Sequence, residues 1–169
     1  MKKTNYIRFL LCSLVSLATA QSTKAQSLPN DKLGDIYAED IKWSAFPAFP
    51  PEARLAVLIG DPKKEGPYVV RVRLPSNVVL MPHKHPETRV YTVISGIFYI
   101  GIGEKYDPAK LKAYPPGSVI VLPANTPHFH WAKSGGYETQ VSAYGPLGIS
   151  YINPSDDPSN TKTNSLIKQ

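Results

Sequence analysis

The sequence predicts an all-β fold, an antiparallel sandwich or barrel, and three observations lead to this prediction. Short runs rich in β-branched and aromatic residues recur from residue 55 onward, and such residues favour strands. The 17 prolines and 11 glycines separate these runs into segments of strand length. Only residues 107–113 could hold a helical turn, so helices contribute little to the predicted fold.

The first 20 residues have the three parts of a secretory signal peptide. A basic start with Lys2, Lys3 and Arg8 precedes an apolar run over residues 9–17, and small residues follow it. The run is shorter than the roughly 20 apolar residues that a membrane-spanning helix needs. We therefore expect residues 1–20 to be removed and the protein to be secreted or periplasmic, with no stable membrane anchor.

Cysteine usage and charge exclude several kinds of site. Cys12, the single cysteine, lies in the leader, so cleavage after Ala20 or after Ala25 leaves neither a disulfide nor a thiolate ligand. Removing 20 of the 169 residues leaves 149, enough for one domain with a sizeable core, and lowers the formal charge from +6 to +3. The remaining basic residues are scattered, which argues against a nucleic-acid partner.

The mature chain divides into three parts. Residues 21–54 are rich in proline, which excludes a long helix, and we expect a lead-in segment that Trp43 anchors to the domain. Residues 55–152 contain the predicted strands and form the β domain. Residues 153–169 are polar and rich in Ser, Asn, Asp and Lys, which predicts a poorly ordered tail.

The strands can be placed from the apolar runs and from the turn residues between them. They are predicted over residues 55–59, 68–74, 90–94, 97–102, 119–122, 129–133 and 139–144. Ser95-Gly96, between the third and fourth run, is typical of a tight turn. These two strands are therefore predicted to pair as a β-hairpin.

Histidines are concentrated in two short segments. His83 and His85 are separated by one residue, so their side chains lie on one face of an extended strand. His128 lies in the second segment, and His130 follows it. Two imidazoles on one face can bind one transition metal ion, and a third from a neighbouring strand can complete the set. The pattern predicts a metal site built from nitrogen and oxygen ligands.

Residues 83–96 and 117–128 resemble the two sequence motifs of the cupin superfamily. The resemblance covers about residues 55–145. Residues 56–58, 60–62, 92–96 and 145–153 look like those of a group of small bacterial cupin-domain proteins of undetermined activity. It implies a cupin-type jelly roll, also called a double-stranded β-helix barrel, with one metal ion in the barrel mouth. It also implies that the exposed sheet edges can pair into a homodimer.

The resemblance implies ligand roles for His83, His85 and His128, but Arg89 occupies the position where the family usually has a glutamate. A cation pointed at a divalent ion is unfavourable, so Arg89 cannot substitute. Three alternatives follow: Glu87 supplies an oxygen ligand, the histidines bind the ion alone with open positions, or the domain has lost the metal and binds an anion. Arg89 would pair with Glu87 or attract a substrate carboxylate.

His130 has a less defined role in this hypothesis. It faces the same side as His128 if the strand is regular, so it can replace His128, orient it, or take no part. We count His130 and Arg89 as candidate substrate-binding residues.

The functional hypothesis is a secreted protein that binds one divalent transition metal, Fe, Mn, Zn or Ni, and acts on a small organic molecule. Dioxygenase- or isomerase-like chemistry is the first candidate. The alternative is a non-catalytic module that binds a small ligand or a metal at a degenerate site, because fold alone does not determine reaction.

Overall fold

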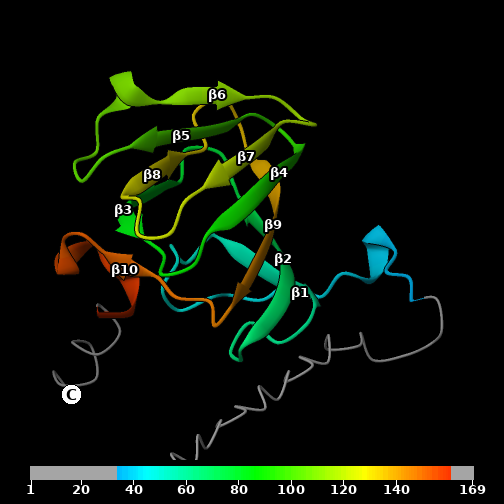
Figure 1. Ribbon diagram of the computed structural model, residues 1–169. Helices are drawn as coiled ribbons and strands as arrows, with labels where there is room; N and C mark the ends of the chain where they lie inside the picture. Colours follow the sequence, from blue (N-terminus) through cyan, green and yellow to red (C-terminus); the bar gives the residue numbers. More distant parts are fainter. Residues whose placement is uncertain (1–33, 161–169) are drawn as a thin grey trace, which may run out of the picture. The chain divides into compact units, whose positions relative to one another are not determined.

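The computed structural model describes residues 34–160, and its strands form two antiparallel sheets (Figure 1). The first sheet has the spatial order β1 (Arg54–Ile59), β2 (Gly66–Leu74), β9 (Tyr137–Gly145), β4 (Arg89–Ser95) and β7 (Val119–Leu122). The second has the order β10 (Ser150–Tyr151), β3 (Val79–Lys84), β8 (His128–Trp131), β5 (Phe98–Ile102) and β6 (Lys112–Tyr114). Successive strands alternate between the sheets in several places, as they do in a jelly roll.

Helical structure in residues 34–160 is limited to short pieces. Three short 3-10 helices are present, η1 (Ala38–Asp40), η2 (Pro108–Lys110) and η3 (Pro154–Asp156). η2 lies within the one segment predicted to hold a helical turn, and the side chain of Asp107 accepts a hydrogen bond from the N–H of Ala109 at its start. In this part of the chain, no helix combines the length and apolar character that crossing a bilayer requires.

The hydrophobic core lies between the two sheets. Every second residue of β2, from Tyr68 to Leu74, is buried, as expected when one face of a strand packs inward. Leu80 of β3 and Phe98 of β5 belong to the same buried cluster from the second sheet. The all-β prediction is confirmed, and the interior enclosed by these two faces contains the histidines.

The predicted hairpin between residues 90–94 and 97–102 is wrong. β4 pairs with β7 and β9, whereas β5 pairs with β6 and β8. Gly96 has a φ of 70°, and a Cβ on it would lie 2.2 Å from the carbonyl oxygen of Gly136. Because a tight turn and a crossing between sheets both require this left-handed backbone, the local sequence does not distinguish them.

The described part of the lead-in segment packs on the β domain. Ser44 forms a bridge with Leu55, and the guanidinium carbon of Arg73 lies 3.9 Å from the centre of the Trp43 ring. Phe49 is 4% exposed and joins the core. The predicted signal peptide, residues 1–20, lies outside the described residues.

Residues 153–160, part of the predicted tail, have a defined course. The side chain of Asn153 accepts a hydrogen bond from the N–H of Ser155 at 3.3 Å, and that of Asp157 accepts one from Ser159 at 2.9 Å. Such local bonds from Asn and Asp side chains to the backbone supply order that overall composition does not reveal. Residues 161–169 lie outside the described part of the chain.

Candidate metal centre

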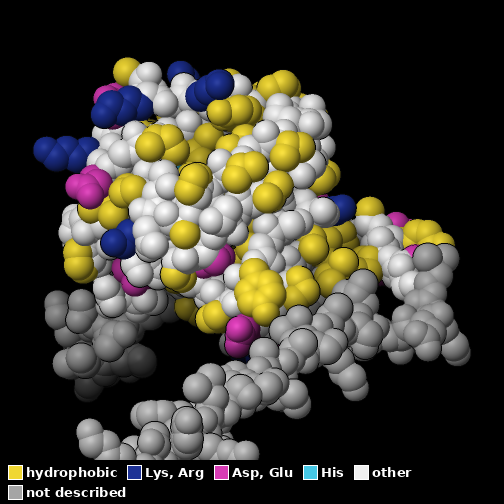
Figure 2. Space-filling model, in the orientation of Figure 1, with side chains coloured by type: hydrophobic (Ala, Val, Ile, Leu, Met, Phe, Trp, Pro, Cys, Tyr) yellow, Lys and Arg dark blue, Asp and Glu magenta, His cyan; other side chains and the backbone are white. Residues whose placement is uncertain are grey.

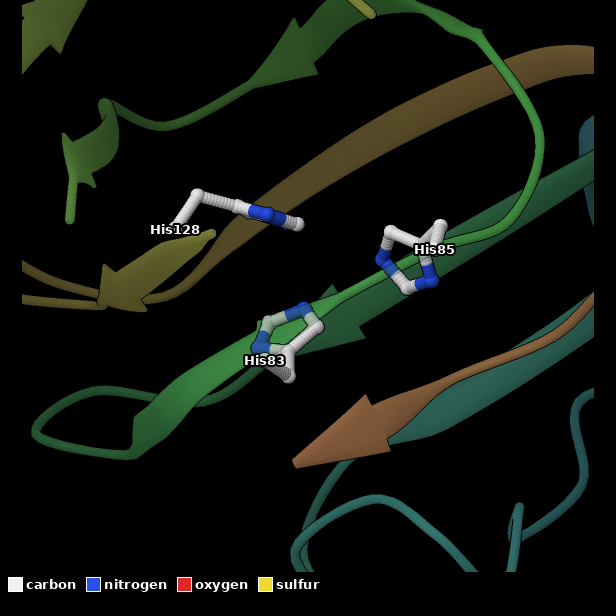
Figure 3. Close-up of side chains that lie close together, drawn as sticks. All are labelled: His83, His85 and His128. Atoms are coloured by element: carbon white, nitrogen blue, oxygen red, sulfur yellow. The ribbon is translucent and has the colours of Figure 1, made fainter. Parts of the chain in front are cut away.

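Two neighbouring strands bring three histidines together inside the barrel. His83 lies on β3, His85 follows the end of that strand, and His128 begins β8. His83 and His128 are direct partners in the β3–β8 ladder. The three residues are between 0% and 3% exposed, and Figure 2 shows no histidine on the face that it presents. The rings point toward a shared space (Figure 3).

The distances within this trio, His83, His85 and His128, allow a metal site. One ring nitrogen of each lies within 4.8 Å of the others. The ring centres of His83 and His128 are 4.2 Å apart, and that of His85 lies 4.9 Å from the first and 5.1 Å from the second. The trio could therefore hold one metal ion, as its spacing on the two strands predicted.

Backbone carbonyls fix the tautomer of each imidazole in the trio. In His83, Nδ1 lies 2.7 Å from the carbonyl oxygen of Met81. In His85 it lies 2.6 Å from that of Gly148, and in His128 it lies 2.9 Å from that of Thr126. A carbonyl can only accept, so Nδ1 carries the hydrogen and Nε2 keeps its lone pair in the neutral ring. Nε2 of His83 and of His128 is buried and has no hydrogen-bond partner within residues 34–160. This is the arrangement expected of metal-binding histidines.

The electrostatic environment keeps the trio neutral. Burial lowers the pKa of His83 and of His85, and nearby positive charge acts in the same direction. Burial also lowers the pKa of His128, to about 4, against the opposing effect of its bond to the Thr126 carbonyl. Neutral imidazole is the form that binds a metal ion, so near pH 7 no proton has to leave before binding.

Glu87 and Arg89 form a buried ion pair beside the trio. Nε of Arg89 donates to Oε1 of Glu87 at 2.9 Å, and Nη2 donates to the same oxygen. Tyr68 donates its hydroxyl hydrogen to Oε1 at 2.8 Å, and the N–H of Gly148 donates to Oε2 at 3.3 Å. Of the sequence-based alternatives for Arg89, the structure shows the pairing with Glu87. The carboxylate is not among the three groups that meet, and ligation by Glu87 stays a prediction.

His130 lies next to the trio but outside it. Its ring centre is 5.0 Å from that of His128 and 5.4 Å from that of His83, which agrees with both residues of β8 facing the same side. It is 5% exposed, and Nδ1 lies 3.4 Å from the hydroxyl oxygen of Tyr137. Its Nε2 is buried and has no hydrogen-bond partner in the part of the chain that the structure describes.

A small cavity of about 20 Å³ lies against these groups. Its walls include His83, His85, Arg89, His130 and the core aromatic residue Phe49. Such a volume holds about one water-sized group. The interior next to the trio is therefore polar on one side, apolar on the other, and narrow.

Gly148 is a positioning residue that the sequence did not reveal. Its carbonyl accepts hydrogen bonds from Nδ1 of His85 and from Arg89, and its N–H donates to Glu87. A Cβ at this position would lie 2.7 Å from the ring of Pro86. The sequence signal was present as a glycine in the segment after residue 145, but only the folded chain places it against a site 60 residues earlier.

No protein-family model matches the sequence, and no curated protein matches it. Solved structures do match. The polyketide cyclase RemF from Streptomyces resistomycificus is 18% identical with a TM-score of 0.62, covering 78% of this chain and 94% of its own. An RmlC-like cupin protein from Ralstonia eutropha is also 18% identical, with a TM-score of 0.56 and coverage of 81% and 88%. The DMSP lyase DddQ from Ruegeria pomeroyi is 17% identical, with a TM-score of 0.54 and coverage of 66% and 61%.

These likenesses identify the fold. The two sheets form a double-stranded β-helix barrel like that of the RmlC-like cupin protein, which is the fold that the resemblance of residues 83–96 and 117–128 to the cupin motifs implied. At such low identity the likeness describes the fold and not the reaction. Chemistry must be argued from the site itself.

Proposed function

We propose that this protein holds one divalent first-row transition metal ion through His83, His85 and His128 and acts on a small organic molecule. The observation that carries the proposal is the meeting of three buried imidazoles, each with Nδ1 bonded to a backbone carbonyl. Iron, manganese, zinc and nickel all suit imidazole ligands. A bound ion of this group polarises a substrate oxygen or, if redox-active, supports chemistry with dioxygen.

The chain's own residues prepare this site for reaction. The carbonyls of Met81, Gly148 and Thr126 hold the rings in one tautomer, so no reorganisation is needed on binding. Glu87 neutralises Arg89, which limits the repulsion between that guanidinium and a bound cation. Arg89 and His130 line the cavity, where they would contact a substrate.

The enzymatic part of the proposal has support from the fold relatives. By their names RemF is a polyketide cyclase and DddQ is a lyase, so this barrel supports reactions of small molecules in both. We propose dioxygenase- or isomerase-like chemistry for this chain. Its site differs from the usual cupin pattern at Arg89, so the reaction of neither relative is transferred to it.

A non-catalytic metal- or ligand-binding module is the second candidate. The cavity of about 20 Å³ favours it, because a bulky substrate could not enter the interior without rearrangement. Oxygen consumption separates the two candidates. Iron- and manganese-loaded protein, screened with small acids and phenols, should consume dioxygen if it is an oxygenase, and isomerisation of the same compounds should be followed by NMR. A metal-loaded protein that turns over none of them favours the module.

Metal content tests the site directly. Purified wild-type protein from metal-replete cells should contain about one equivalent of a transition metal, measured by elemental analysis. His83→Ala and His128→Ala should each contain less than about a tenth of an equivalent while keeping the β-sheet circular dichroism spectrum. His130→Gln is the matched control, since it changes a neighbouring buried imidazole outside the trio, and it should keep the metal. A metal-free wild type would overturn the proposal.

We also propose that the protein is exported after removal of residues 1–20. The basic start and apolar run of the leader support this. Expression of the full chain in a Gram-negative host, followed by fractionation and N-terminal sequencing, tests it. Mature protein that begins near residue 21 or 26 in the periplasm is expected, and an intact leader on cytoplasmic protein would contradict export.

A further inference from the structure

The cavity beside the trio contains two polar atoms that the proposed metal site does not use. The hydroxyl of Tyr91 and Nε2 of His130 are buried without a hydrogen-bond partner among the described residues. Both residues line the cavity, and they are 3% and 5% exposed. Leaving such an atom buried and unpaired is unfavourable, because it has lost its hydrogen bonds to water. A group that enters the cavity and bonds to both atoms would recover this free energy.

Both atoms are available as hydrogen-bond donors. The hydroxyl oxygen of Tyr137 lies 3.4 Å from Nδ1 of His130, and burial raises the pKa of Tyr137 well above its ordinary value, so this hydroxyl keeps its proton and can donate to the ring. When Nδ1 accepts that hydrogen, the ring hydrogen of His130 is on Nε2, which is then a donor. Tyr91 keeps its proton as well, because burial raises its pKa.

Arg89 adds positive charge to the same wall of the cavity. The guanidinium is near enough to Tyr91 to oppose the rise of its pKa, although no hydrogen bond of normal geometry reaches the hydroxyl. The cavity is therefore lined by two donors and a cation, and Glu87 already balances the charge of that cation. A ligand that fits this lining is an acceptor, and it should be small because the volume is about 20 Å³.

We infer that the cavity binds one carboxylate oxygen of a small organic acid, through the Tyr91 hydroxyl and Nε2 of His130. The inference deepens the proposed function by assigning its substrate class. It rests on that function, because the bound metal ion supplies the positive charge that favours an anion. Glu87 and Arg89 cancel and the trio is neutral, so a bound divalent ion leaves an excess of positive charge that an anion compensates. The rest of the acid lies outside the cavity, which has room for about one oxygen atom.

Formate binding to Co²⁺-loaded protein tests this inference. The visible absorption of the cobalt reports ligand binding, and cobalt content is measured separately. Formate should bind at least about tenfold more tightly than formamide, which has the same size and no charge. Tyr91→Phe should weaken formate binding about tenfold or more, since a hydrogen bond to a charged group contributes about 1.5–3 kcal/mol. Cobalt content should not change.

Matched variants separate the inference from the proposed function. Tyr144→Phe removes a hydroxyl that is 57% exposed and should bind formate like the wild type. His130→Leu removes the second donor. If Tyr91→Phe fails to fold, this variant tests the binding of the same formate oxygen independently. Wild-type protein that takes up no cobalt would refute the metal site. Normal cobalt uptake with equal formate affinity in the wild type and in the donor variants, or with equal affinity for formate and formamide, would overturn the carboxylate site alone.

Discussion

Two glutamates in this barrel bind arginines, one inside and one on the outer face, and the comparison shows how the exposure of the arginine changes what an ion pair does. Glu87 pairs with Arg89 in the interior, where the two side chains are 7% and 4% exposed. Glu138 has a side chain that is only 8% exposed, and it accepts bonds from Arg71 and Arg73, whose side chains are 22% and 50% exposed. The outer arginines keep contact with water, while the inner arginine has exchanged water for Glu87 and Gly148.

The two clusters also differ in what they hold in place. Glu138 and Arg73 face each other across the β2–β9 ladder, so their bond supports strand pairing that the backbone already specifies. Glu87 joins residues that are distant in sequence, since it accepts from Tyr68 and from Gly148. Gly148 in turn bonds to His85. The inner pair is therefore part of the support of the candidate site, and the outer cluster is not.

Removing the inner carboxylate should have the largest effect on stability. Glu87→Ala leaves Arg89 buried without its counter-ion, and removing one partner of a buried pair costs about 3–5 kcal/mol. The free energy of unfolding, measured by urea denaturation, should fall by that amount. Glu138→Ala is the matched outer variant, and we expect a loss of about 1 kcal/mol because its partners reach solvent.

A double variant shows whether the loss comes from the uncompensated charge. Glu87→Gln with Arg89→Met removes both charges with little change in volume, and such replacements of buried pairs are often neutral. The double variant should be more stable than Glu87→Ala. Equal losses from Glu87→Ala and Glu138→Ala would show that burial does not distinguish the clusters.

Lowering the pH should have the second largest effect on stability, and it should act on the metal-free protein. The pKa of His128 is lowered to about 4 in the folded state from an ordinary value of about 6.5, mainly by burial. The unfolded chain therefore takes up a proton first as the pH falls, so the stability is complete above about pH 6.5 and declines toward pH 4. We expect a loss of about 3 kcal/mol from this group.

Urea denaturation of chelator-treated protein between pH 7.5 and 4.5 measures this decline. Burial lowers the pKa of His83 and of His85 as well, so their contributions have the same sign. In His128→Gln the decline should become shallower, because one of the neutral imidazoles is absent. A stability that stays constant from pH 7.5 to 4.5 would show that these rings are not held neutral by burial.

The sequence could predict features that depend on local pattern and not those that depend on distant partners. The strand over residues 119–122 was predicted with its observed bounds, because a run of β-branched and apolar residues between turn residues defines it locally. His83 and His85 could be grouped because residues two apart share a strand face, and the resemblance to the cupin motifs added His128. The hairpin at Gly96 failed because pairing is decided by which strands meet, and Gly148 was missed because its contacts lie far away in the sequence.

The cavity illustrates the same limit. Tyr91 and His130 lie on different strands, and their unpaired atoms have meaning only after the two sheets have packed together. The strand assignment of each residue could be made from neighbouring side chains. The donor properties of Nε2 in His130 depend on Tyr137, and no sequence pattern reports the hydroxyl that lies 3.4 Å away in the fold.

Arg73→Ala should have the smallest effect on stability, and it tests the comparison at the solvent-exposed cluster around Glu138. The substitution removes a 2.8 Å bond to Glu138 and the contact with the Trp43 ring, while Arg71 still compensates Glu138. Exposed ion pairs and cation–π contacts each contribute about 0.2–1 kcal/mol, so the free energy of unfolding should fall by about 1 kcal/mol. Because salt screens exposed charges, the difference from the wild type should shrink between 0.1 M and 1 M NaCl. A loss above about 2 kcal/mol that does not respond to salt would mean that the outer cluster behaves like a buried pair, and solvent contact would no longer explain the difference between the two glutamates.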